Sequence, residues 1–327
     1  MSNYEFKSNF SEHICGLIKQ KRAIGYKYEP QEAILRRFDM FCYTYYPNEH
    51  TLTKELVLHW GTRTCTESIR TQRRRITPIR SLGEYISCFA EKEAYIYPMR
   101  VLPRHSSYTP HIFSDEEIKN LFEAIDNVKY CANAPIRHLI LPIYFRVLYC
   151  CGLRLSEVQK LTPEQVDLEN GILTILDSKN GKDRLIPMHE SLTEMCRIYA
   201  KKARIYETNQ AYFFPNTCGG EYSSSSLYKF FRAKLWECRI SHGGRGSGPR
   251  IHDFRHTFAV KCLKSWVISK KDLNACLPYL KTYLGHCSFN DTAYYLRLTA
   301  DIYPELLKQI EESCGGIIPV IGGELNA

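Results

Sequence analysis

A proline-rich stretch divides this chain into two halves of different character. The segment YPMRVLPRHSSYTPHIF, residues 97–113, contains three prolines and two serines and few apolar anchors. Prolines at this density favour an extended linker over a helix or a paired strand. We therefore expect an N-terminal domain over residues 1–97, a linker over 98–113, a second domain over 114–303 and a C-terminal tail over 304–327.

The first domain should be helical. Apolar residues recur at helical spacing in SNFSEHICGLIKQKRAI, PQEAILRRFDMFCYTYY and TESIRTQRRRITPIRSLGEYISCFAEKE, and no strand pattern occurs between them. We expect four or five helices. The longest should bend or break near Pro78, because proline removes a helical hydrogen bond.

The second domain should mix helices with a little sheet. Ser114 and Glu117 form a capping box at the start of a helix. The segment IRHLILPIYFRVLYCCG is apolar nearly all round and predicts a buried helix. Residues 171–176 and 184–188 are β-branched and apolar and flank the turn-rich DSKNGKD, which predicts a hairpin with a lysine-bearing loop. The predicted fold class is mainly α with a small β-hairpin or sheet.

Composition limits which binding partners and which cellular location we expect for the protein. Lysines and arginines outnumber aspartates and glutamates by 44 to 35, a formal net charge of +9 that is compatible with a polyanionic partner. No apolar run approaches the roughly 20 residues of a membrane helix, and the polar, acid-bearing N-terminus does not resemble a signal peptide. The 14 cysteines contain no CxxC pair, so we expect no metal site. We expect a cytoplasmic protein without a membrane partner.

Five short segments of the second domain carry polar groups that together suit phosphoryl transfer. They are CGLRLSE, SKNGKDRLIP, HDFRHTFA, LGH and TAYY. Two guanidiniums can hold one phosphate and stabilise the charge of its transition state without a metal. A histidine can move a proton, a lysine can protonate a leaving alkoxide, and a tyrosine can form a covalent intermediate.

Each of these residues alone also has a structural explanation. Arg154 and Glu157 are three apart and suit an internal ion pair. Hairpin lysines such as Lys179 are usually solvated, and helical tyrosines usually belong to the core. The combination and order of all five segments favour the chemical interpretation.

In that order the segments resemble the tyrosine recombinases, also called the phage integrase family. The family pattern has an arginine in a GLR-x-SE element, a hairpin lysine, the run H-x-L-R-H-T-F-A, the run LGH, and a tyrosine nine residues after that histidine. The resemblance covers about residues 110–305. It implies that Arg154 and Arg255 hold the scissile phosphate and that Tyr295 is the nucleophile. Lys179 would protonate the 5′ leaving oxygen, and His252 would assist proton transfer. His286 would hydrogen-bond the phosphate, and Glu157 would orient the site without touching the substrate.

This sequence departs from the family pattern at three places. Phe254 stands where leucine is usual, and Cys287 stands where serine is common. The glycine of the hairpin loop is shifted by one residue, which leaves Lys182 as an alternative to Lys179. We favour Lys179. None of the departures removes a required functional group.

The adjacent tyrosines Tyr294 and Tyr295 cannot both reach one phosphate, because a helix turns by about 100° per residue. Tyr295 lies nine residues after His286 and three after Thr292, which is the family spacing. We therefore predict that Tyr295 is the nucleophile. Tyr294 should be buried or should contact a neighbouring subunit.

The resemblance further implies a site-specific DNA recombinase or integrase of a mobile element, with a covalent 3′-phosphotyrosine intermediate and no cofactor. Its partner is double-stranded DNA, bound as a homotetramer in the synaptic complex by a chain that is a monomer or dimer when free. Part of 304–327 would pass to a neighbouring subunit; a tail packed on its own subunit is the open alternative. A type IB topoisomerase-like relaxing enzyme and a DNA-binding regulator with an unused site also stay open.

The helical N-terminal domain would be the family's core-binding (SAM-like) domain, which clamps DNA. Between residues 63 and 80 there are six arginines against one acid, Glu67. A solvated helix surface and a DNA-binding surface both explain this run. As DNA contacts we predict Arg70, Arg73, Arg74, Arg75 and Arg80.

Overall fold

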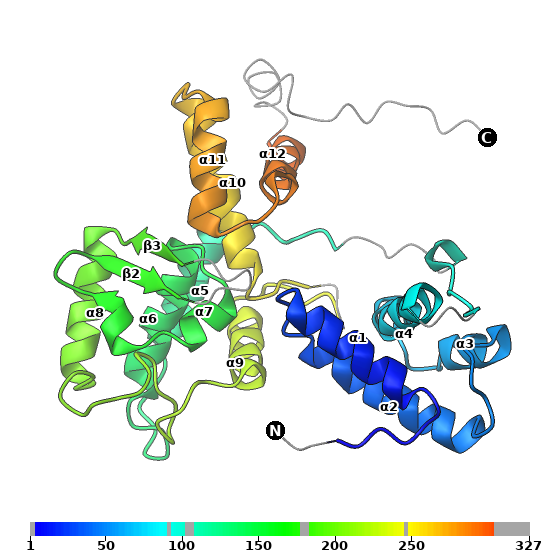
Figure 1. Cartoon of the computed structure of the whole chain (residues 1–327). Helices are drawn as coiled ribbons and strands as arrows, with labels where there is room; N and C mark the ends of the chain where they lie inside the picture. The colour runs from blue at the N-terminus through cyan, green and yellow to red at the C-terminus, as the bar shows by residue number, and fades with distance from the viewer. Residues whose placement is uncertain (1–3, 90–92, 102–107, 177–182, 245–247, 304–327) are drawn as a thin grey trace. The chain divides into compact units, whose positions relative to one another are not determined.

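The computed structural model describes residues 4–89, 93–101, 108–176, 183–244 and 248–303. It divides into two compact units, Met1–Ser107 and Tyr108–Ala327, each of which is described by itself (Figure 1). The division falls inside the stretch expected to be a linker, and residues from Tyr108 onward belong to the second unit. The tail 304–327 and the hairpin loop that carries Lys179 lie outside the described residues.

The described part of the first unit is helical, as its apolar spacing predicted. Its elements are α1 (Ser11–Ala23), α2 (Glu29–Tyr45), α3 (Lys54–Gly61), α4 (Ile69–Phe89) and the 3-10 turn η1 (Met99–Val101). Helix α4 packs against the other three helices, with Pro78 inside it. Phe10, Phe38 and Leu82 are wholly buried and belong to one hydrophobic core.

The second unit is built mostly from helices around a small sheet. Its helices are α5 (Asp115–Asp126), α6 (Arg137–Cys150), α7 (Leu155–Gln159), the 3-10 turn η2 (Pro163–Gln165), α8 (Glu190–Lys202), α9 (Ser224–Glu237), α10 (Asp253–Ile268), α11 (Leu273–Leu284) and α12 (Phe289–Ile302). Both hydrogen bonds of the predicted capping box are present at α5, between Ser114 and Glu117. The apolar segment predicted as a buried helix is α6, whose Ile140, Tyr144 and Phe145 have no exposed surface.

The sheet has three antiparallel strands in the order β1 (Val166–Asp167), β2 (Ile172–Ile175) and β3 (Arg184–Pro187). The predicted hairpin is the β2–β3 pair, with Ile175 opposite Arg184. Strand β1 was not predicted, because two residues are too short to display an alternating pattern. The fold class predicted from the sequence, mainly α with a small sheet, is confirmed.

Helix α10 joins two hydrophobic clusters of the second unit. Phe254, in its first turn, belongs to the cluster built around α5, α6 and the sheet. Ala259 and Leu263, further along the helix, belong to a second cluster shared with α11 and α12. The start of α10 is therefore fixed by packing on the first cluster, and its remainder by packing on the second.

Candidate active site

Arg154 and Glu157 form the first part of the site. Arg154 caps the short helix α7, and its backbone N–H donates to Glu157 Oε2 over 2.9 Å while its Nη1 donates to Oε1 over 2.8 Å. The Glu157 side chain is 4% exposed. Burial would raise the pKa of this carboxyl, but the hydrogen bonds and charges of two arginines outweigh burial and lower it. Glu157 is therefore a fixed anion at neutral pH.

The second arginine on Glu157 is Arg184, the first residue of β3, which the sequence analysis did not select. Its Nη1 and Nη2 donate to Oε1 and Oε2 of Glu157 over 3.0 and 2.8 Å, a two-pronged contact. The Arg184 side chain is 6% exposed. One buried carboxylate thus lies between two guanidiniums from different elements.

Arg255 lies in the first turn of α10 and is 1% exposed. Its Nη1 donates to the carbonyl of Gly152 over 2.9 Å and its Nη2 to the carbonyl of Leu284 over 2.5 Å. Burial, together with the positive charge of Arg154, lowers the pKa of Arg255 to about 10. The guanidinium remains a cation at neutral pH, held by backbone carbonyls.

The end of α11 gathers all three guanidiniums. Three consecutive carbonyls there each accept one arginine hydrogen bond: Tyr283 from Arg184 Nε over 2.8 Å, Leu284 from Arg255 Nη2 and Gly285 from Arg154 Nη2 over 2.9 Å. The last carbonyls of a helix lack partners within it and carry partial negative charge. Gly285 has a φ of +65°, so the chain turns out of α11 here and leads directly to His286.

His286 follows that turn and is fixed by α12. Its Nδ1 lies 2.9 Å from the hydroxyl of Thr292, which is wholly buried. Burial first, and then the charge of Arg255, lower the pKa of His286 to about 4. The imidazole is therefore neutral at pH 7. Thr292 is a site residue that the sequence analysis used only as a spacing marker.

Tyr295 lies against His286 inside the site. The two rings are nearly parallel, with centroids 5.9 Å apart and planes at 14°. Tyr295 is 3% exposed, and burial raises the pKa of its phenol; the charge and hydrogen bond of Arg255 offset only part of that rise. Tyr294 is 39% exposed, so the expected burial is not found, and the alternative expectation of contact with a neighbouring subunit stays a prediction. Of the two adjacent tyrosines, Tyr295 is the one in contact with the Arg255 guanidinium.

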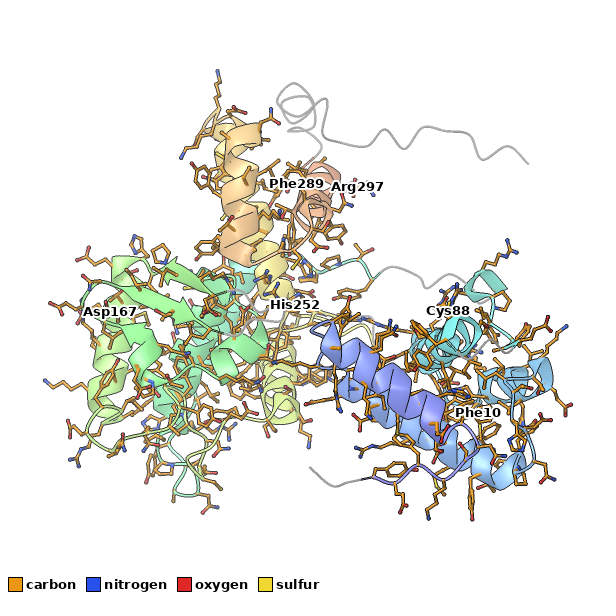
Figure 2. The ribbon with its side chains drawn as sticks, viewed as in Figure 1. Phe10, Cys88, Asp167, His252, Phe289 and Arg297 are labelled. Carbon is orange, nitrogen blue, oxygen red and sulfur yellow. The ribbon has the colours of Figure 1, made fainter. Side chains whose placement is uncertain are left out.

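Two histidines from α10 lie beside these tyrosines. His252 caps the start of α10 at its exposed surface, where Figure 2 labels it, and its ring lies 4.9 Å from that of His256. The His256 ring lies 5.6 Å from Tyr295. Burial, then the neighbouring His252 and Arg255, lower the pKa of His256 to about 3. His252 faces outward, whereas His256 is a neutral inner neighbour of the tyrosine.

The start of α10 is tied to the beginning of the second unit. The Tyr108 hydroxyl donates to Asp253 Oδ2 over 2.6 Å, and the Arg250 guanidinium stacks on the Tyr108 ring at 3.5 Å. The Phe113 backbone N–H donates to the hydroxyl of Thr257 over 3.1 Å. Asp253 has no exposed surface, and burial raises its pKa. Residues 108–113 thus hold the helical turn that carries the candidate His252 and Arg255.

The predicted site residues Arg154, Glu157, Arg255, His286 and Tyr295 meet in one place, with His252 at its edge. Lys179, predicted as the proton donor to the leaving group, lies outside the described residues, as does Lys182. Arg184 and Thr292 are additions that only the structure supplies. In the part of the chain that the structure describes, no cluster of three or more His, Cys, Asp or Glu side chains is arranged to hold a metal ion.

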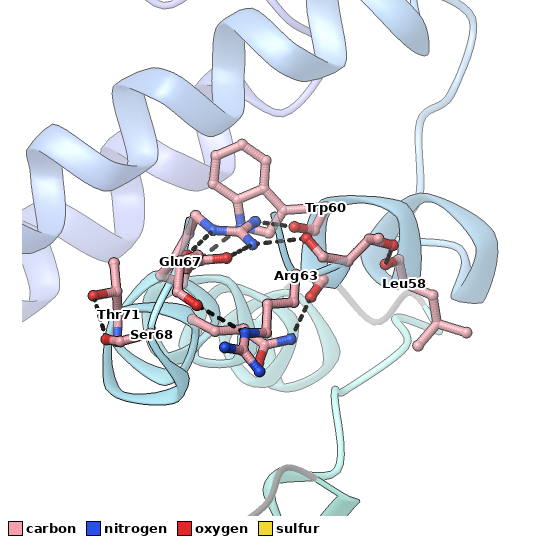
Figure 3. A network of polar contacts seen from close by, with 10 residues as sticks. Leu58, Trp60, Arg63, Glu67, Ser68 and Thr71 are labelled. Atoms are coloured by element: carbon pink, nitrogen blue, oxygen red, sulfur yellow. Dashed lines mark hydrogen bonds and ion pairs between the residues drawn. The ribbon is translucent and has the colours of Figure 1, made fainter. Parts of the chain in front are cut away.

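The arginines of the first unit differ in what they contact. Arg75 donates to both oxygens of Glu67 and to the carbonyls of Trp60 and Thr62, and it stacks on the Trp60 ring at 5.0 Å. Figure 3 shows this network, in which the Arg63 Nε also donates to the Glu67 carbonyl over 2.7 Å. The guanidinium of Arg75 is therefore engaged inside its own unit.

The other predicted DNA contacts of α4 are more accessible. Arg70 and Arg74 are exposed, whereas Arg73 and Arg80 are half-buried. Arg80 pairs with Glu84 one turn further on, over 2.9 Å. Within the described ranges, no helix is both long enough and apolar enough to span a membrane.

The chain is similar in sequence to a known protein family and to several of its members. Residues 112–301 match the family model described as the phage integrase family. An integrase/recombinase by name, y4rB of Sinorhizobium fredii, is 30% identical over 93% of this chain and 98% of that protein. The tyrosine recombinase XerA of Pyrococcus furiosus is 29% identical over 68% of each chain.

Solved structures share the fold. The site-specific recombinase XerH, in a post-cleavage complex with its palindromic difH substrate, has a TM-score of 0.63 at 19% identity and covers 94% of this chain and 91% of its own. The Tn1549 transposon integrase bound to transposon right-end DNA has a TM-score of 0.60 at 15% identity, with coverage of 90% and 99%.

Proposed function

Because the chain belongs to the phage integrase family and is a tyrosine-type site-specific DNA recombinase, we propose that it breaks and rejoins duplex DNA with Tyr295 as the nucleophile. The observation that carries this assignment is the burial of the Tyr295 phenol against His286 and the guanidinium of Arg255. Cationic groups around a phenol favour its ionised form. Tyr294, 39% exposed, lacks that surrounding.

In the proposed step, the Tyr295 oxygen attacks phosphorus and the bond from phosphorus to the 5′ oxygen breaks. The products are a 3′-phosphotyrosine and a 5′ hydroxyl. One proton leaves the phenol and one reaches the 5′ oxygen, so the step balances without a cofactor. One phosphoester replaces another, so attack by a 5′ hydroxyl on the phosphotyrosine rejoins the strand.

Arg154 and Arg255 would hold the phosphate that is attacked. Both guanidiniums are anchored by carbonyls of the same turn, at Gly285 and Leu284. Donors fixed before the reaction stabilise developing charge without reorganising during it. The lowered pKa of Arg255, about 10, still leaves it charged at pH 7.

The two candidate histidines would act differently. If the Thr292 hydroxyl donates to Nδ1 of His286, the neutral ring carries its proton on Nε2 and offers that N–H to a phosphate oxygen. His252, exposed at the start of α10, is placed to exchange protons with the incoming substrate and with solvent.

The proton for the 5′ leaving oxygen would come from Lys179. Lys179→Ala should slow strand cleavage, and a 5′-thio leaving group, which needs no proton, should restore the rate. Lys182→Ala is the matched control on the same loop. If the 5′-thio substrate restores the rate of Lys182→Ala and not that of Lys179→Ala, the proton donor is Lys182, three residues further along the sequence.

Duplex DNA is the proposed partner, with both units contacting it. Exposed Arg70 and Arg74 of α4 would neutralise phosphates of the DNA backbone.

Four protomers would assemble on two duplexes for strand exchange, and part of 304–327 would dock on a neighbouring subunit. Light scattering with and without DNA tests the assembly. Transfer of a strand to a second duplex, as against relaxation alone, separates a recombinase from a DNA-relaxing enzyme.

A nicked suicide substrate tests the central step. Tyr295→Phe keeps the ring and removes the oxygen, so this variant should bind duplex DNA and form no covalent adduct. Tyr294→Phe is the matched control and should still form the adduct. An adduct that persists in Tyr295→Phe and disappears in Tyr294→Phe would reverse the assignment. No adduct with any version of the chain would contradict the proposed function and favour a DNA-binding regulator.

A further inference from the structure

One buried guanidinium of the site has no role in the reaction as described so far. Arg184 is 6% exposed and directs all three nitrogens of its guanidinium at the protein: Nη1 and Nη2 at Glu157 and Nε at the carbonyl of Tyr283. It cannot touch a phosphate with the same donors. We propose that Arg184 is a positioning residue that engages the Glu157 carboxylate and so keeps Arg154 directed at the phosphate. This inference rests on the proposed function.

The contacts of Glu157 suggest how this works. Its carboxylate accepts both prongs of Arg184 but receives the Arg154 side chain through Nη1. Arginine and carboxylate prefer to pair through two parallel hydrogen bonds. Without Arg184, Arg154 is the arginine left to form such a two-bonded pair with Glu157. The guanidinium of Arg154 would then turn toward the carboxylate and lose its hold on a phosphate.

Charge leads to the same expectation. Two guanidiniums on one buried carboxylate leave one net positive charge at this part of the site. Removing Arg184 leaves a neutral Arg154–Glu157 pair. The field that acts on a phosphate dianion in the transition state would therefore weaken even if Arg154 stayed in place.

The turn at the end of α11 connects the positioning residue to the rest of the site. Arg184 donates to Tyr283, and Arg154 donates to Gly285, two residues along and immediately before His286. A Cβ added at Gly285 would lie 3.2 Å from Nη1 of Arg184, and the φ of +65° disfavours a side chain there. Gly285→Ala therefore disturbs Arg184 without removing its charge.

The test is a double-mutant cycle on the nicked suicide substrate with Arg184→Gln, Glu157→Gln and the double variant. Arg184→Gln should slow single-turnover cleavage by about 100-fold, as the loss of a charge-stabilising donor does, with duplex binding little changed. The double variant should recover about tenfold over Arg184→Gln, because the remaining amide no longer captures Arg154. A scaffold role alone predicts no such recovery, since Glu157→Gln restores none of the contacts that Arg184→Gln removes.

The 5′-thio substrate is the control for the hairpin, because β3 begins at Arg184 directly after the lysine-bearing loop. Arg184→Gln should stay slow on this substrate. Full rescue would mean that the arginine acts on the leaving-group proton and not through Arg154, which contradicts the proposal. Should Arg184→Gln not fold, Arg184→Lys and Gly285→Ala replace it, each with an intact cation and an expected smaller loss.

A crystal structure of the variant separates this inference from the proposed function. In Arg184→Gln, both Nη atoms of Arg154 should contact the Glu157 carboxylate. Arg154 that keeps its hydrogen bond to the Gly285 carbonyl and its wild-type rotamer would overturn the positioning role, whatever the activity. Failure of the wild-type chain to form an adduct would instead contradict the proposed function and leave this crystallographic result to decide the inference.

Discussion

The two units each contain a buried glutamate paired with arginine, and the two clusters differ in how many arginines share the carboxylate. In the first unit, Glu67 takes both prongs of Arg75, whose remaining donors go to carbonyls. In the second unit, Glu157 is divided between Arg184 and Arg154. A carboxylate paired with one arginine neutralises the charge of that arginine. A carboxylate shared by two arginines leaves one net positive charge that a substrate can use.

The comparison also shows why the number of arginines is a poor guide to a DNA surface. Arg75 belongs to the arginine-rich run but is committed to its own unit. Arg154 and Arg255 lie far apart in the sequence, yet neighbouring carbonyls of one turn hold both guanidiniums. The proposed phosphate site therefore depends on how the arginines are oriented and not on how many occur in one run.

The largest expected effect comes from removing the shared carboxylate. Glu157→Ala leaves the buried guanidinium of Arg184 and the half-buried guanidinium of Arg154 without their anion and should lower the free energy of unfolding of the second unit by about 3–5 kcal/mol. It should also abolish adduct formation. Glu67→Ala is the matched change in the first unit and should leave adduct chemistry intact. Hydrogen exchange of α6 and of α4 reports the stability of each unit; loss of cleavage in Glu67→Ala would break the comparison.

The next effect is on DNA affinity. Arg74→Ala should reduce the salt dependence of duplex binding by about 0.9 unit of slope, the amount for one lost phosphate contact. Arg75→Ala, its neighbour, should leave the slope unchanged and lower the stability of the first unit. Titration at several salt concentrations distinguishes the two. A reduced slope in Arg75→Ala would mean that its pairing with Glu67 opens on DNA.

A pH effect that depends on buried histidines is expected in the second unit. The pKa values of His286 and His256 are lowered in the folded chain, to about 4 and about 3 from 6.5. Between these values and 6.5 the unfolded chain binds more protons, so stability falls as the pH drops from 6.5 toward 4. Urea midpoints followed over this range should decline for the second unit. His256→Gln should flatten the decline, and an unchanged pH dependence would contradict the buried, neutral state of this ring.

The smallest effect concerns the start of α10. Tyr108→Phe removes the hydroxyl that donates to Asp253 and should cost about 1 kcal/mol of stability. If this contact also holds His252 and Arg255 in place, single-turnover cleavage should slow several-fold without a change in duplex affinity. Tyr130→Phe, on an exposed tyrosine of the same unit, is the control.

Local signals in the sequence were enough for much of the fold and for most of the site. The capping box at Ser114, the apolar α6 and the β2–β3 hairpin are each encoded by neighbouring residues. The order of the five segments was enough to identify the family. These features depend on spacing within one element, which a single sequence displays directly.

Contacts between distant residues were not predictable in the same way. Arg184 meets Glu157 across 27 residues and Tyr283 across 99, and Arg154 meets Gly285 across 131. No periodic pattern encodes such pairs. Arg75 was taken for a surface group because its partner, Glu67, lies before α4 begins, outside the helical spacing that relates side chains along one face.

The most direct test of the account is the identity of the residue that becomes linked to DNA in the wild-type chain. After reaction with a nicked suicide substrate and digestion, mass spectrometry of the DNA-linked peptide that contains both tyrosines should place the phosphodiester on Tyr295. This result is predicted by the burial of that phenol beside His286 and Arg255. Linkage at Tyr294, or at any residue outside α12, would contradict it.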